Sequence, residues 1–246
     1  MIRLTIHEDA AAAAHDVARR LRSAIESHPA CVLGLPTGRT PIPVYEQLVA
    51  WVRAGDLSLG DATTFNLDEF AGLGAEAPGS FQQFMQTHLF GRIPPGRAPH
   101  HFLDGLATDL EQEARRYEQA IADAGGLDVV ILGLGTNGHI GFNEPAEALP
   151  ASTRVVELTD ETRRANVDGF AGVIDAVPHR AITMGVGTML AARRVVLIAT
   201  GASKAAAVAA AVDGPLTTRV PASLLQLHPH AEVVLDHAAA ARLRRR

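Results

Sequence analysis

Short apolar segments alternate with longer amphipathic segments along this chain. Seven of the apolar segments have the length and the β-branched composition of strands: 3–7, 31–35, 62–67, 128–134, 181–186, 194–200 and 231–236. Several are apolar on both faces, which is typical of parallel strands covered by helices on each side. Apolar residues at helical spacing, such as Val17 and Leu21, occupy the stretches between them. The pattern predicts an α/β fold: an open, doubly wound, mostly parallel sheet of about seven strands with helices on both faces, as in Rossmann-like proteins.

We expect one domain over residues 1–246, because no internal repeat and no low-complexity linker divides the chain. The least regular stretches are 72–80 and 150–178. Long irregular excursions beside a site often act as lids, so the region 150–178 is a predicted lid.

Composition narrows the class of protein. Of the 246 residues, 47% are hydrophobic and 20% are charged, which is enough for a substantial buried core. The net charge of -5 argues against a nucleic acid or an acidic membrane as the main partner, but it leaves room for an anionic small molecule. The single cysteine, Cys31, predicts no disulfide framework. The chain shows no signal-peptide pattern and no apolar run near the ~18 residues of a transmembrane helix, so we expect a cytoplasmic protein.

Ligands of such sheets bind beyond the carboxyl ends of the strands, so the loops that follow the strands hold the candidate site. After strand 31–35, the loop PTGRTP opens a helix and contains Thr37, Gly38, Arg39 and Thr40. A glycine-bearing loop at a helix start presents free backbone N–H groups to an anion, and a guanidinium can fork onto phosphate oxygens. Thr40 could also cap the helix. We predict phosphate binding; the alternative is a tight turn with a solvated arginine.

A second loop, GASK, follows strand 194–200 and puts Lys204 in the first turn of a helix. The helix macrodipole disfavours a cation there, which is easier to understand if an anion joins it. The alternative is a long side chain that reaches into water. Two such loops on one sheet strengthen the phosphate prediction.

Asp68 and Glu69 follow strand 62–67. As neighbours they are expected to point in different directions, so they are not expected to work as a paired acid and base. One could be a general base and the other structural; the alternative is a capped turn.

The fourth loop is GLGTNGHIGFNEP, residues 133–145. Its first six letters match the dinucleotide-binding pattern G-x-G-x-x-G, but that pattern requires a helix directly after the glycines. Gly141 and Pro145 prevent such a helix, which excludes dinucleotide binding. The loop is instead predicted to hold His139 and Glu144 over a substrate, since imidazole titrates near neutral pH and a carboxylate can orient it.

The remaining histidines do not suggest a metal site. His100 and His101 are adjacent, His228 and His230 flank a proline, and no pair has the i, i+4 spacing of HExxH. No serine lies in a G-x-S-x-G elbow. We expect neither a metal nor a serine nucleophile.

The segments LGLPTGRTP, TTFNLDEFAGL, GLGTNGHIGFNEP, ITMGVGTML and PASLLQLHP closely resemble the glucosamine-6-phosphate deaminase/isomerase family in order and spacing, over almost the whole chain. The resemblance implies one amino-sugar-phosphate deaminase domain that converts glucosamine 6-phosphate and water into fructose 6-phosphate and ammonium, without metal or organic cofactor. The implied catalytic residues are Asp68, Asn137, His139 and Glu144, and the implied phosphate-binding residues are Thr37, Gly38, Arg39, Thr40 and Lys204. In this scheme His139 opens the sugar ring, and Asp68 moves a proton from C2 to C1.

The chain departs from the family pattern at two places. Some members carry aspartate at Asn137; asparagine can orient His139 but adds no charge. Most glucosamine-type members read T-G-G-T where this chain has Arg39, and they place a phosphate-binding arginine where Asp168 aligns, shortly after a T-R-x-A-N motif. We hypothesise that Arg39 takes over that role. Galactosamine-6-phosphate enzymes also lack parts of the glucosamine pattern, so the sugar epimer stays open.

Two other functions share this fold. A 6-phosphogluconolactonase-like hydrolase would keep the phosphate loops but is expected to lack NLDE followed by NGHIGFNEP. A non-catalytic sugar-phosphate sensor domain normally comes attached to a helix-turn-helix region. Allosteric deaminases use an arginine–lysine pair where this chain has Arg154 and Val156, so we expect hyperbolic kinetics. The expected partner is a small amino-sugar phosphate, with no nucleic acid and no membrane, and we expect a monomer or small homo-oligomer.

Overall fold

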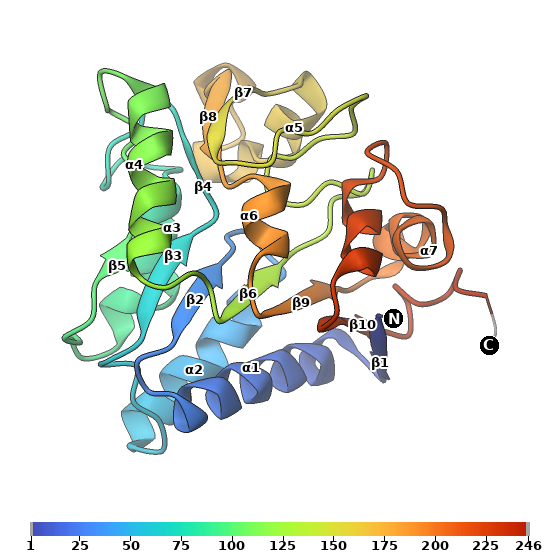
Figure 1. Ribbon diagram of the computed structural model, residues 1–246, viewed down its shortest axis with the longest axis horizontal. Coiled ribbons are helices and arrows are strands. Elements are labelled where there is room, and N and C mark those ends of the chain that lie inside the picture. The colour runs from blue at the N-terminus through green and yellow to red at the C-terminus, as the bar shows by residue number, and fades with distance from the viewer. Residues whose placement is uncertain (1, 245–246) are drawn as a thin grey trace.

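Seven parallel strands form the central sheet of the computed structural model, which describes residues 2–244 (Figure 1). The strands are β1 (Arg3–His7), β2 (Val32–Leu35), β3 (Thr63–Asn66), β5 (His100–His101), β6 (Val129–Leu132), β9 (Arg194–Ala199) and β10 (Ala231–Asp236). They lie in the order β1-β10-β9-β6-β2-β3-β5, and every neighbouring pair is parallel. The predicted α/β fold with an open parallel sheet is confirmed.

Helices cover both faces of the central sheet. Helices α1 (Ala10–Ser27), α2 (Ile42–Ala54) and α3 (Phe81–His88) pack on one face, and α4 (Leu110–Asp123), α6 (Val186–Leu190) and α7 (Ala205–Asp213) pack on the other. Alternate strand residues supply the two cores: Val129 and Ile131 face the first set of helices, whereas Val130 and Leu132 face the second. This double burial explains why the strand segments are apolar on both faces. Within residues 2–244, no helix is both long and apolar enough to cross a membrane.

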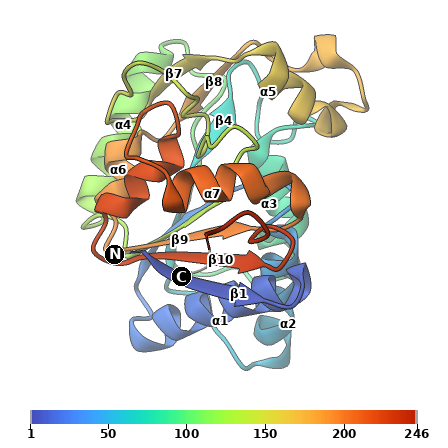
Figure 2. The same ribbon diagram turned by 90° about the vertical axis from the view of Figure 1, so that its right-hand side faces the viewer.

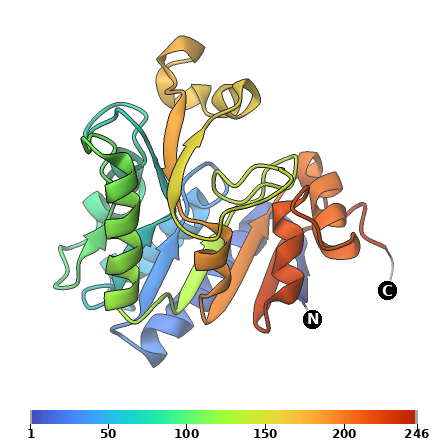
Figure 3. The ribbon, with the colours of Figure 1, turned by 45° about the horizontal axis from the view of Figure 1, so that its top comes forward.

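A second, antiparallel sheet rises from the carboxyl edge of the central sheet (Figure 3). It contains β4 (Asp68–Phe70), β7 (Arg154–Glu157) and β8 (Arg180–Thr183), in the order β4-β8-β7. The segment 181–186 was predicted as a strand of the main sheet, and this prediction is wrong because its strand belongs here; the short strand β5 takes the seventh place. Ala181 and Ile182 are fully buried, so their local pattern looks like that of a central parallel strand.

The predicted lid region, 150–178, supplies strand β7 of the small sheet and a short helical segment beside that sheet, which we call the cap (residues 158–178). After β7 the chain forms helix α5 (Asp160–Ala165) and two short 3-10 turns before it enters β8. An aromatic cluster packs within this part of the molecule, with ring centroids 4.8 to 5.8 Å apart. Its members are Phe70, Phe81, Phe142 and Phe170. Movement of this region as a lid stays a prediction.

The first and last strands meet at one edge of the central sheet (Figure 2). β1 is the edge strand and pairs with β10 in register from Arg3 to His7. Two of its apolar side chains, Leu4 and Ile6, are 38% and 43% exposed.

Candidate active site

Four strand-end loops lie next to one another at the carboxyl edge of the central sheet. They follow β2, β3, β6 and β9, which are consecutive in the order β9-β6-β2-β3. Parallel strands end at the same edge, so segments that are far apart in the sequence come together here. These are the four loops that contain every predicted site residue.

His139, Asn137 and Glu144 form one hydrogen-bonded cluster. His139 Nδ1 lies 2.7 Å from Asn137 Oδ1 and 3.3 Å from Glu144 Oε1, and Asn137 Nδ2 donates to Glu144 Oε2 at 2.7 Å. Both neighbours of Nδ1 are acceptors, so Nδ1 carries the proton of the neutral imidazole and Nε2 is left to exchange a proton with a bound molecule. The structure thus brings three of the four predicted catalytic residues together.

Glu144 is held in its charged form by its surroundings. Burial alone would raise its pKa, but hydrogen bonding to His139 and the positive charge that this ring has when protonated, with further hydrogen bonds from Thr162 and Asn137, lower the pKa to about 2. Thr162 Oγ1 donates to Glu144 Oε1 at 2.7 Å from helix α5. Sequence reasoning missed Thr162, although this residue begins the TRRAN segment that matches the family's T-R-x-A-N motif.

The glycines of the 133–145 loop are required by close packing. A Cβ atom at Gly135 would lie 2.2 Å from the ring of His139, whose backbone oxygen accepts from Gly135 N at 2.9 Å. At Gly138 the φ angle is 91°, which favours glycine, and a Cβ atom would lie 2.8 Å from Val220. These glycines therefore allow the imidazole to fold back over its own loop. No helix follows between residues 142 and 153, so this loop lacks the helix N-terminus that the dinucleotide-binding pattern requires.

Asp68 approaches the same loop from β4. A Cβ atom at Gly141 would lie 3.3 Å from Asp68 Oδ2, so the carboxylate faces the loop directly. The residue is 6% exposed, and its carboxylate makes no hydrogen bond with any residue in the range 2–244. Burial raises the pKa of Asp68 to about 8, and the charge of Glu69 adds to the effect. A buried carboxylate without hydrogen bonds, next to an imidazole cluster, is suited to act as a general base.

Glu69 faces different surroundings and has a structural role. Its carboxylate accepts hydrogen bonds from the backbone N–H groups of Phe70, Phe81 and Gln82 at 2.8, 2.9 and 2.9 Å. The last two residues form the first turn of α3, so the carboxylate satisfies the free N–H groups at that helix start. Burial raises the pKa of Glu69 to about 7, against the opposing effect of these bonds.

The loops after β2 and β9, which were predicted to bind phosphate, place the cations Arg39 and Lys204 near each other. Burial and the positive charge of Arg39 lower the pKa of Lys204. Arg39 is exposed, and its Nη1 lies 3.5 Å from Asp168 Oδ2. Gly38 between β2 and α2 has a φ angle of 102°, which favours glycine. The expected cap by Thr40 is wrong, because the next residue, a proline, occupies the N-cap of α2 and no side chain caps that helix.

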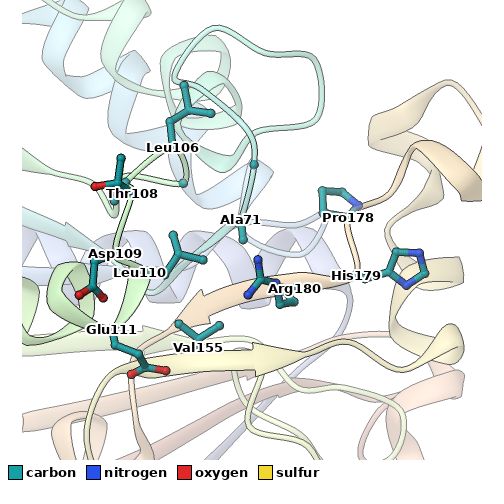
Figure 4. Close-up of a pocket in the computed structure, with 13 residues that line it drawn as sticks. Ala71, Leu106, Thr108, Asp109, Leu110, Glu111, Val155, Pro178, His179 and Arg180 are labelled. Carbon is teal, nitrogen blue, oxygen red and sulfur yellow. The ribbon is translucent and has the colours of Figure 1, made fainter.

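A cavity beside the small sheet lies away from these groups. It has a volume of about 780 Å³ and is lined by the N-terminus of α4, the start of β8 and the loop around Leu106 (Figure 4). Its polar lining mixes Asp109 and Glu111 with Arg180, and none of the predicted site residues belongs to it. We therefore assign the candidate active site to the strand-end loops. Among residues 2–244, no group of three or more histidine, cysteine, aspartate or glutamate side chains could hold a metal ion.

Comparison with known proteins decides the family. The family model described as glucosamine-6-phosphate isomerases/6-phosphogluconolactonase matches residues 5–235. The chain belongs to this family. The resemblance seen in the sequence motifs is confirmed.

Individual members of the family resemble the chain over nearly their full length. It is 48% identical over 246 residues to a glucosamine-6-phosphate deaminase of Rhodopirellula baltica, covering 100% of this chain and 98% of the relative. It is 44% identical over 241 residues to a glucosamine-6-phosphate deaminase of Streptomyces avermitilis, covering 98% and 92%. A solved structure of a monomeric glucosamine-6-phosphate deaminase matches with a TM-score of 0.94 and 39% identity, covering 98% of this chain and 100% of that one.

The lactonases of the family are more distant. A 6-phosphogluconolactonase from Trypanosoma cruzi matches with a TM-score of 0.77 at 19% identity, covering 100% of this chain and 98% of that one. This similarity shows a shared fold.

Proposed function

We propose that the chain is a glucosamine-6-phosphate deaminase, which converts glucosamine 6-phosphate and water into fructose 6-phosphate and ammonium. The observation that carries the proposal is the position of Asp68, a buried carboxylate without hydrogen bonds in the described chain, against the loop that holds His139. Lactone hydrolysis needs no base for a C–H bond, whereas this reaction does. The names of the relatives at 48% and 44% identity support the same substrate.

In the proposed mechanism, His139 opens the sugar ring. Its Nε2 takes the proton of the O1 hydroxyl and returns a proton to the ring oxygen O5, which turns the cyclic hemiacetal into an open aldehyde. Asn137 and Glu144 hold the Nδ1 side of the ring, and the anionic carboxylate stabilises the imidazolium that forms in between. Because His139 handles the oxygen atoms, Asp68 is available to take the proton from C2.

Asp68, in its ionised form, then moves a proton from C2 to C1. Because the C2–H bond is only mildly acidic, the base has to be held close to it. Removal of the C2 proton by Asp68, with a proton from solvent added to the aldehyde oxygen O1, gives an enolamine; return of the proton from Asp68 to C1 gives an iminium ion at C2, and the proton taken up at O1 is balanced by the one released when water adds to C2. Water adds to C2 and ammonia leaves, which completes fructose 6-phosphate. Each step moves only protons, water and ammonia, so the scheme balances without a redox cofactor.

The phosphate is proposed to bind between the two cationic loops, at Thr37, Gly38, Arg39, Thr40 and Lys204. Burial and then the charge of Arg39 lower the pKa of Lys204; the second cause supports this assignment, since a phosphate between the two cations relieves their repulsion. We propose that Arg39, whose Nη1 lies 3.5 Å from Asp168 Oδ2, supplies the guanidinium that other members place at position 168. Remote binding energy of this kind holds the sugar in register with the catalytic groups.

The Arg39→Ala variant tests the phosphate assignment. Loss of a charge-assisted hydrogen bond costs roughly 1.5–3 kcal/mol, so KM for the sugar phosphate is expected to rise by about tenfold or more. Arg97→Ala is the matched control, because Arg97 is an exposed arginine with an ion pair to Asp61 at 3.8 Å, just before β5. A rise in KM of less than about threefold for Arg39→Ala would contradict the assignment.

Ammonium release from the two amino-sugar epimers tests the function itself. Purified protein is incubated with glucosamine 6-phosphate or with galactosamine 6-phosphate, and ammonium is followed over time. Release from the first substrate supports the proposal, and release only from the second would reassign the protein to the galactosamine epimer. Release from neither would refute deamination and leave a lactonase or a sugar-phosphate sensor as the candidates.

The remaining parts of the proposal concern assembly and regulation. We propose a cytoplasmic monomer with hyperbolic kinetics and a lid over residues 150–178. The similarity to a monomeric deaminase at 39% identity supports the monomer. Size-exclusion chromatography with light scattering tests the assembly, and sigmoidal kinetics would contradict the proposed lack of regulation.

A further inference from the structure

Two adjacent residues of the catalytic loop are held by side chains from the region 150–178. Thr162 donates to Glu144, and Arg154 Nη1 donates to Asn143 Oδ1 at 2.8 Å. Arg154 lies at the start of β7, before the cap, and is partly buried. The loop that bears His139 is therefore fixed from outside at a second point, one residue from Glu144.

Asn143 has one possible orientation in this structure. The residue is fully buried, and its Nδ2 donates to the backbone oxygens of Ile140 and Met184, both at 2.9 Å. With the amide donors used, Oδ1 is left as an acceptor, and Arg154, which can only donate, occupies that position. The arginine thus completes a hydrogen-bond set that ties the loop to itself and to β8.

Arg154 lies in the same cross-strand row of the small sheet as Asp68, the proposed base. In the small sheet, Thr183 is paired with Asp68 on one side and with Arg154 on the other. Residues directly opposite one another in antiparallel strands project to the same face, so these three side chains share one face of the sheet. The catalytic loop lies on that face: Thr183 Oγ1 accepts from Phe142 N at 3.1 Å, and a Cβ atom at Gly141 would meet both Thr183 Oγ1 and Asp68 Oδ2.

We propose that Arg154 is a positioning residue that keeps the His139 loop in register over Asp68, through Asn143. This inference rests on the proposed function, because ring opening by His139 and proton transfer by Asp68 act on one substrate and need a fixed separation. A small displacement of the loop misaligns the imidazole of His139 with O1 and O5 of the sugar, whereas the phosphate-binding loops stay in place. Within residues 2–244, the hydrogen bond of the Arg154 side chain goes to Asn143 and not to any of the proposed phosphate-binding residues.

Steady-state kinetics of Arg154→Met and Arg154→Lys test the proposal. In Arg154→Met, kcat is expected to fall roughly 10-fold to 100-fold, the range for a lost hydrogen bond to a charged group, with KM changed by less than about threefold. Lysine can still donate to Asn143 Oδ1, so Arg154→Lys is expected to recover part of kcat. Arg180→Met is the matched control, since it removes an exposed arginine from β8 of the same small sheet, and it is expected to keep the wild-type kcat.

The isotope effect at C2 separates positioning from a merely structural role. With glucosamine 6-phosphate deuterated at C2, slower ring opening in Arg154→Met is expected to shrink the isotope effect on kcat toward 1. A variant that only lowers the folded fraction would lose activity with an unchanged isotope effect, and this result would overturn the proposal. Equal losses in the methionine and lysine variants, or a kcat within twofold of the wild type in Arg154→Met, would overturn it as well.

A wrong functional proposal can be told apart from a wrong role for Arg154. If the wild-type protein releases no ammonium from either epimer, the ring signals of His139 in an NMR pH titration replace kinetics as the readout. A shift of these signals in Arg154→Met but not in Arg180→Met supports the positioning role of Arg154. Unchanged His139 signals would overturn it.

Discussion

Replacing Asp68 with asparagine tests two effects of this carboxylate separately: its contribution to the rate of catalysis and its effect on the free energy of unfolding. The residue is 6% exposed, its carboxylate makes no hydrogen bond within residues 2–244, and burial and the charge of Glu69 raise its pKa from 3.8 to about 8. Asparagine has the same shape and no ionisable proton. We expect the Asp68→Asn variant to lose catalysis and to gain stability at alkaline pH.

The sign and the size of the stability change follow from the pKa. Between about pH 4 and pH 8 the carboxyl is ionised in the unfolded chain but protonated in the folded protein, so the wild type loses stability as the pH rises through this window. At about 1.4 kcal/mol per unit, a pKa raised from 3.8 to about 8 corresponds to at most about 6 kcal/mol above pH 8. Relaxation and water entry lower this ceiling, so we expect about 2–4 kcal/mol.

Thermal unfolding from pH 4 to pH 9 measures this difference. For a protein of this size, Asp68→Asn is expected to melt roughly 5–10 °C above the wild type at pH 8 and close to it at pH 4. Asp56→Asn is the control, since it removes an exposed carboxylate that lies outside the candidate site, and it is measured over the same pH range. Ammonium release is expected to fall by about 10²-fold to 10⁴-fold, the usual contribution of a general base. A stability difference that does not grow between pH 4 and pH 8 would refute the assigned burial of an unpaired carboxylate.

Two further substitutions probe the neighbours of the site. Glu69→Gln is expected to lower stability by about 1–3 kcal/mol, because glutamine offers one acceptor atom to three backbone N–H groups; urea unfolding measures it, and a variant as stable as the wild type would contradict the structural role. Thr162→Val removes the 2.7 Å hydrogen bond to Glu144, so kcat is expected to fall roughly 3-fold to 10-fold in the ammonium assay. Thr162→Ser keeps the hydroxyl and is its control; equal activity of the two variants would show that the hydrogen bond does not contribute.

The fold and the meeting of the loops could be predicted from the sequence because both follow local rules. Apolar strands alternate with amphipathic helices, which specifies a parallel sheet, and the carboxyl ends of parallel strands meet at one edge. His139 and Glu144 share one loop, so their proximity needed no knowledge of tertiary structure. The rejection of a dinucleotide site depended on Gly141 and Pro145, which prevent a helix whatever the surrounding fold.

The small sheet could not be predicted, because strand partners are not encoded in local patterns. Asp68 lies two residues beyond the end of β3, and its segment continues into a new strand only because β8 is there to pair with it. The neighbours Ala181 and Ile182 are both fully buried by tertiary packing, so the sequence of their segment looks like that of a strand in the main sheet. Thr162 and Arg154 act through side chains that cross from one segment to another, and such contacts depend on how the segments pack.

The pairing of the edge strand with the last strand determines when the molecule can be completed during synthesis. Of the seven strands in the central sheet, β1 leaves the ribosome first, and β10, its neighbour in the sheet, leaves last. Contacts between such distant segments form slowly, because almost the whole chain has to be closed into a loop. Until β10 arrives, β1 has no strand to pair with, and its apolar residues Leu4 and Ile6 are available to other chains. Of the strands in the central sheet, β1 is therefore the one that waits longest for its partner during synthesis, and at which aggregation of the nascent protein is expected.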